Sequence, residues 1–74
     1  MATIIFIGWQ IGMRGIPFMK LLNAKANISL KRAMEIKIKI VDDEVIELNV
    51  KDTARANEII EEARELGVLC ELKS

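Results

Sequence analysis

Three segments of the chain have the apolar pattern of β-strands. Residues 3–9 (T-I-I-F-I-G-W) are β-branched or aromatic almost throughout, which favours a strand with apolar side chains on both faces. Residues 45–50 (V-I-E-L-N-V) also favour a strand, and residues 68–73 (V-L-C-E-L-K) alternate between two faces. We therefore expect three strands.

Helical spacing lies between these strands. A first helix is predicted to begin at Pro17, where the missing N–H of proline costs nothing, and to end near Ala26. Its apolar stripe contains Phe18, Leu21 and Leu22. Pro17 and this stripe together predict a helix directly after the glycine-rich segment that follows the first strand.

Two further helices have recognisable starts. Ser29 is a candidate N-cap for the second helix, and Asp52 or Thr53 for the third. The third has the clearest helical stripe in the chain, and Gly67 ends it as a left-handed cap. The stripe consists of Ala56, Ile59, Ile60, Ala63 and Leu66.

Residues 35–41 fit two structures. Isoleucines alternate with lysines there, which is typical of a strand, yet Met34, Ile38 and Val41 also have helical spacing. We favour a helix to about Ile40. The element order is then β-α-α-β-α-β in one domain spanning residues 1–74. This order predicts a two-layer α+β sandwich, with three helices on one face of a three-stranded sheet.

The charges are unevenly distributed although the net charge is zero. Residues 14–39 carry seven basic residues and one acidic residue, whereas residues 42–74 carry four basic and ten acidic ones. Such a division predicts an acidic partner for the basic face. The alternative is that the two halves neutralise one another.

The residue types leave little room for chemistry. The chain has one cysteine and no histidine, which excludes an internal disulfide and the usual zinc and imidazole chemistry. We expect a non-enzymatic protein without metal or cofactor, with Cys70 in the core and residues 8–15 as a tight turn. The longest uncharged run, residues 1–13, is shorter than the ~20 residues of a membrane span, so we expect a cytoplasmic protein.

Two stretches resemble a known family. Ile16, Met19 and Lys20, followed by Leu30 and Lys31, match the Ile-x-x-Ile-Lys and Leu-x-Leu-Lys stretches in the C-terminal domain of the bacterial ribosomal stalk protein. Residues 56–73 are similar to that domain's closing helix and its Val-Glu-Leu-Lys strand. The resemblance covers about residues 14–73 and implies the same β-α-α-β-α-β fold.

The resemblance has departures. Asn27 and Ser29 stand where the stalk family has glycines, and the family's dimerisation helices and hinge have no counterpart. The ClpS adaptor family is similar in fold, but its degron pocket needs an Asn-Asp pair and a histidine that this chain lacks. A ClpS-like adaptor that docks on a chaperone or protease without reading degrons is the alternative.

The resemblance also implies a binding surface. The basic side of the stalk helix pair docks on translational GTPases, and Lys20 and Lys31 match that pattern. Asn23 replaces a basic residue of the family, and Arg32, which replaces an acidic one, is a neighbour of the matching lysines. The predicted partner-binding residues are Lys20, Asn23, Lys31 and Arg32. The alternative is a solvated helix face without a partner.

The first strand suggests a second surface. Ile4 and Phe6 are expected on one face, and Ile5, Ile7 and Trp9 on the other. Helices cover only one face of a two-layer domain, so the second face would be an exposed apolar patch. We therefore predict self-association through Ile5, Ile7 and Trp9.

Overall fold

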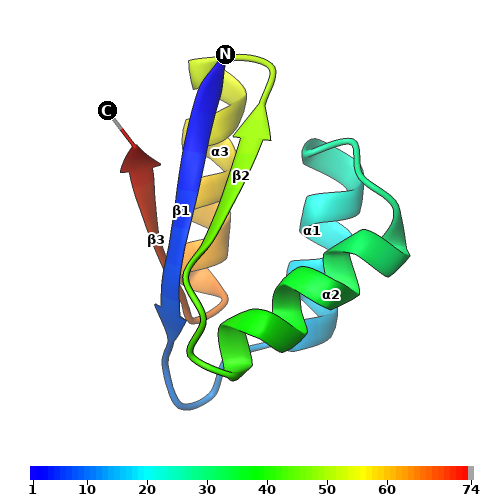
Figure 1. The fold of residues 1–74 in the computed structure, drawn as a ribbon, viewed down its shortest axis with the longest axis vertical. Helices are drawn as coiled ribbons and strands as arrows, with labels where there is room; N and C mark the ends of the chain where they lie inside the picture. The colour runs from blue at the N-terminus through cyan, green and yellow to red at the C-terminus, as the bar shows by residue number, and fades with distance from the viewer. Residues whose placement is uncertain (74) are drawn as a thin grey trace.

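A computed structural model describes residues 1–73, and its element order is the one predicted (Figure 1). Residues 35–41 are helical, as favoured above. The elements are β1 (Ala2–Trp9), α1 (Gly15–Lys25), α2 (Leu30–Val41), β2 (Ile46–Val50), α3 (Thr53–Glu65) and β3 (Val68–Lys73).

The sheet has β1 in its centre. Its order is β2-β1-β3, and both neighbours run antiparallel to β1. Ile4 pairs with Leu48 on one side and with Leu72 on the other. The strand that is most apolar in the sequence is thus the one with two hydrogen-bonded neighbours.

The helices form a second layer, but they do not contact the sheet equally. Helices α2 and α3 pack directly on the strands, whereas α1 packs on α2 and α3. In Figure 1, α3 runs behind the three strands and α1 and α2 lie to one side. Helix α1 reaches the sheet through Phe18, whose ring meets Phe6 edge-on at a centroid distance of 5.6 Å.

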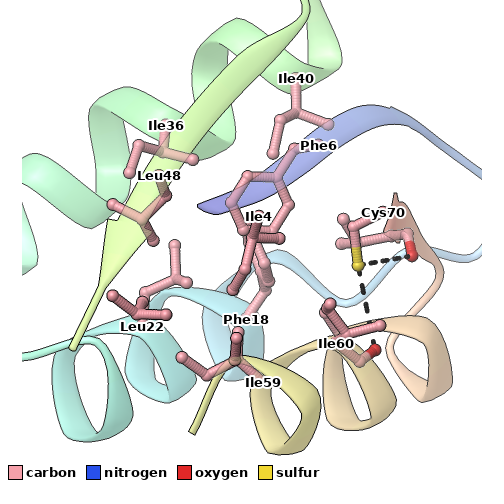
Figure 2. Packing of buried hydrophobic residues seen from close by; sticks show 14 of the residues in the cluster. Ile4, Phe6, Phe18, Leu22, Ile36, Ile40, Leu48, Ile59, Ile60 and Cys70 are labelled. Carbon is pink, nitrogen blue, oxygen red and sulfur yellow. Dashed lines mark hydrogen bonds between the residues drawn. The ribbon is translucent and has the colours of Figure 1, made fainter. Parts of the chain in front are cut away.

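The core is apolar throughout the described residues, with no buried polar or charged side chain in it. Ile4 and Phe6 lie in its middle, between side chains of all three helices (Figure 2). The third helix buries four of the five residues of its predicted stripe, and Leu66 packs against the same cluster. These contacts explain how a small domain orders three helices.

The helix starts are mostly as expected. The Ser29 hydroxyl accepts a hydrogen bond from the Arg32 N–H (3.1 Å), and the Asp52 carboxylate accepts one from the Arg55 N–H (2.7 Å). Helix α1 differs, because it begins at Gly15 and Pro17 is its third residue. The first turn has no intrahelical partner for any of its N–H groups, so Pro17 is tolerated there as well.

The loop from β1 to α1 is held against the turn from α3 to β3. Gln10 N–H donates to the Gly67 carbonyl (2.8 Å) and Arg14 N–H to the Leu66 carbonyl (2.9 Å). Gly67 has a φ of +89°, and a Cβ at this position would lie 2.9 Å from Met13 Cα. Gly67 is therefore both the predicted helix cap and the point at which two loops touch.

Candidate functional site

The predicted site residues are not gathered in one place. Lys20 is exposed and lines a groove of about 380 Å³ between α1 and α3, together with Glu62 and Glu65. Lys31 and Arg32 lie in the first turn of α2 instead. The basic surface of the helix pair is therefore spread around it.

One cation of this groove is already engaged. Lys25 Nζ lies 2.6 Å from Glu62 Oε2 and 3.6 Å from Glu58 Oε2. The hydrogen bond to Glu62, supported by the negative charges of Glu62 and Glu58, raises the pKa of Lys25 above its ordinary value. Arg55 Nη1 also donates to the Lys25 carbonyl (3.1 Å). Lys25 thus ties α1 to α3 and is not a free binding group.

The other predicted residues differ in what they touch. The Asn23 side-chain amide donates to the Ile28 carbonyl (2.7 Å), so it holds the loop between α1 and α2. Arg32 Nη1 lies 3.7 Å from Glu35 Oε2. Within residues 1–73, Lys20 and Lys31 have no ion-pair partner and remain available to a ligand.

A feature that the sequence reasoning missed lies on α2. Four apolar side chains are exposed on one side of this helix, and we refer to them as the α2 stripe: Leu30, Met34, Ile38 and Val41. The helical spacing of Met34, Ile38 and Val41 is visible in the sequence, where it favours a helix over a strand but does not show that this side is exposed. The core is filled by the other side of α2, through Ala33, Ile36 and Ile40.

A β-bulge changes the predicted sheet surface. Leu69 pairs with Gly8 and Val68 pairs with Trp9, so Ile7 has no partner on β3. Residues directly opposite one another in an antiparallel pair share a face. Trp9 therefore lies opposite the buried Val68, but it remains exposed, as Ile7 does. Self-association through Ile5, Ile7 and Trp9 stays a prediction.

Cys70 occupies the core as expected, at 4% exposure. Its Sγ lies 3.9 Å from the carbonyl oxygens of Ile60 and Val68 (Figure 2). Burial raises the pKa of the Cys70 thiol to about 11, against the opposing effect of Arg64. At neutral pH this thiol is protonated and is no nucleophile.

This burial predicts slow alkylation of Cys70. At pH 8 we expect the folded protein to react with iodoacetamide at least about a hundredfold more slowly than the urea-unfolded chain, since only the thiolate reacts. The raised pKa also makes stability depend on pH, because the thiol loses its proton near pH 9 in the unfolded chain but only near pH 11 in the fold. The contribution of this thiol to the free energy of unfolding is therefore retained below about pH 9 and is lost as the pH rises toward 11. Mass spectrometry measures the first effect and urea titration the second. Equal alkylation rates would contradict a buried thiol.

No metal site or membrane span is evident in the described part of the chain. Residues 1–73 contain no cluster of three or more metal-binding side chains, and none of their helices has the length and apolarity to cross a membrane. Comparisons with protein-family models, curated proteins and solved structures found no match.

Proposed function

We propose that the protein is a non-enzymatic, cytoplasmic interaction module that binds an acidic protein through the exposed side of the α1–α2 helix pair. In line with the resemblance to the stalk domain, the proposed partner is a translational GTPase. The observation that carries the proposal is that Lys20 and Lys31 are exposed and unpaired within residues 1–73, on helices that also present exposed apolar side chains.

This combination suits a protein partner. Exposed cations on rigid helices attract an acidic surface and raise the association rate, while apolar side chains contribute most of the affinity once water is excluded. Nucleic acid fits less well, because the acidic α3 lies beside α1 and the chain has no set of stacking aromatic residues.

Charge reversal tests the proposal. We expect the double variant Lys20→Glu, Lys31→Glu to bind a translational GTPase from the same source at least about tenfold more weakly at low salt. The matched control is Lys51→Glu, which reverses another exposed lysine that has no ion-pair partner within residues 1–73 and lies just before the start of α3. Amide NMR of the labelled parent should show shifts at residues 20–23 and 29–32.

Two results would contradict this function. One is that the parent protein shows no shifts with the GTPase at high micromolar concentration. The other is that the double variant binds as tightly as the Lys51→Glu control. Absence of GTPase binding would favour the adaptor alternative, with docking on a chaperone or protease, whereas binding that survives charge reversal would place the GTPase on another surface.

A further inference from the structure

The α2 stripe has no cover within the described residues. Leu30 is 52% exposed, Met34 44%, Ile38 49% and Val41 40%. The residues follow one another at intervals of four, four and three positions, the spacing of a seam between two packed helices. The stripe therefore has the form of a helix-packing surface on a helix that already buries a different side in the core.

The charges at the ends of α2 oppose its own dipole. Lys31 and Arg32 lie in the first turn, where acidic side chains are favoured, and Asp42, Asp43 and Glu44 follow the last turn, where basic ones are favoured. Within residues 1–73 neither Lys31 nor Asp42 has an ion-pair partner. Lys39 is a complementary basic side chain in the last turn, but the first turn has no acidic one, so the start of α2 lacks a charge that would stabilise it.

A second copy of the chain supplies both missing elements. We propose that two copies associate through their α2 stripes, with the two α2 helices antiparallel about a two-fold axis. Each stripe then covers the other, and the basic start of one helix lies beside the acidic end of its counterpart. The two helix dipoles also run in opposite directions, which is favourable.

The helical geometry agrees with this pairing. At 3.6 residues per turn, Lys31 and Asp42 lie within about 20° of each other around α2, both on the same flank of the stripe. In an antiparallel, two-fold arrangement equal flanks meet, so Lys31 of one copy faces Asp42 of the other, twice per dimer. Arg32 lies about 100° further around the helix and keeps its contact with Glu35.

The expected dimer is weak. Four half-exposed side chains per copy cover less surface than the roughly 800 Å² per partner of a stable complex. We expect a dissociation constant on the order of 100 µM, which concentration-dependent sedimentation of the isolated protein measures directly.

The apolar part of the interface is tested by a pair of variants. Ile38→Asp on the stripe should raise the dissociation constant at least about tenfold, whereas Ile7→Asp on the open sheet face should leave it unchanged. Both side chains are about half exposed, so both variants are expected to fold, and thermal melting checks this. Met34→Glu serves as a second stripe variant.

The antiparallel pairing is tested by charge exchange. Lys31→Glu places two acidic pairs in the dimer and Asp42→Lys places two basic pairs, so each variant alone should dimerise about tenfold more weakly at low salt. An equal mixture of the two should recover association, because each Lys31–Asp42 contact then joins opposite charges. Recovery by mixing is specific to an antiparallel dimer.

Three outcomes would overturn the proposal. They are a parent protein that stays monomeric at about 1 mM, a loss of association caused by Ile7→Asp instead of Ile38→Asp, and a mixture that associates no better than its components. All three are measured on this chain alone. They need no GTPase, and although Lys31 takes part in both proposals, Ile38→Asp and Asp42→Lys test the dimer alone, so the dimer can fail while the proposed function holds.

Discussion

Replacing Phe6 with alanine is expected to lower the free energy of unfolding by about 3–5 kcal/mol. Phe6 is fully buried on the central strand, and its ring meets that of Phe18 edge-on. A chain of this length has a total stability of about 4–11 kcal/mol, so the variant would lose a large part of it. Urea titration followed by the fluorescence of Trp9, the single tryptophan, measures the effect.

The control for this prediction is Ile11→Ala. Ile11 is equally apolar but 99% exposed, so its truncation should change stability by less than about 0.5 kcal/mol. If Phe6→Ala and Ile11→Ala unfolded at the same urea concentration, Phe6 would not be the centre of the core. Phe18→Ala should lower the free energy of unfolding by about as much as Phe6→Ala, because either truncation removes the ring contact that joins α1 to the sheet.

Gly67→Ala is expected to cost at least about 2 kcal/mol, through two separate effects. Its φ of +89° disfavours any side chain, and the new Cβ would lie 2.9 Å from the backbone of Met13. The second effect has no easy relief, because backbone hydrogen bonds from Gln10 and Arg14 hold the two loops together. Thermal and urea unfolding measure the total.

Gly12→Ala separates these two effects. Gly12 has a φ of +93°, close to that of Gly67, but no atom lies within 4 Å of the position of its Cβ. This variant should therefore show the conformational cost alone, about 1–2 kcal/mol. Equal losses of stability in the two variants would mean that the close approach of the new Cβ at position 67 to Met13 contributes nothing.

The fold could be predicted because its elements are encoded locally. The three strands, the order of the helices and the caps at Ser29 and Asp52 depend on spacing and on single residues, and the structure confirms them. Residues 35–41 were ambiguous because isoleucine at every second position fits a strand. Helix α2 prevails since Ile36 and Ile40 fill the core together with Ala33 of the preceding turn.

The surfaces were harder to predict because they depend on contacts between distant residues. The bulge at Ile7 follows from the pairing of β1 with β3, and it places Trp9 opposite Val68. Likewise, nothing near Lys25 in the sequence indicates that Glu58 and Glu62 neutralise it from another helix. The apolar spacing of the α2 stripe was visible, but only the structure shows which side of the helix the core uses.

The position of β1 in the sheet also bears on the order in which the protein folds. Within residues 1–73, no strand is joined to the next strand along the chain by a short hairpin. Ile4 of β1 pairs with Leu48 and Leu72, which lie far away in the sequence. Closing such long loops is slow, whereas α1 and α2 pack across a short connection. We expect the α1–α2 pair to gain structure first and the sheet to assemble in the final, rate-limiting step, when β3 completes it.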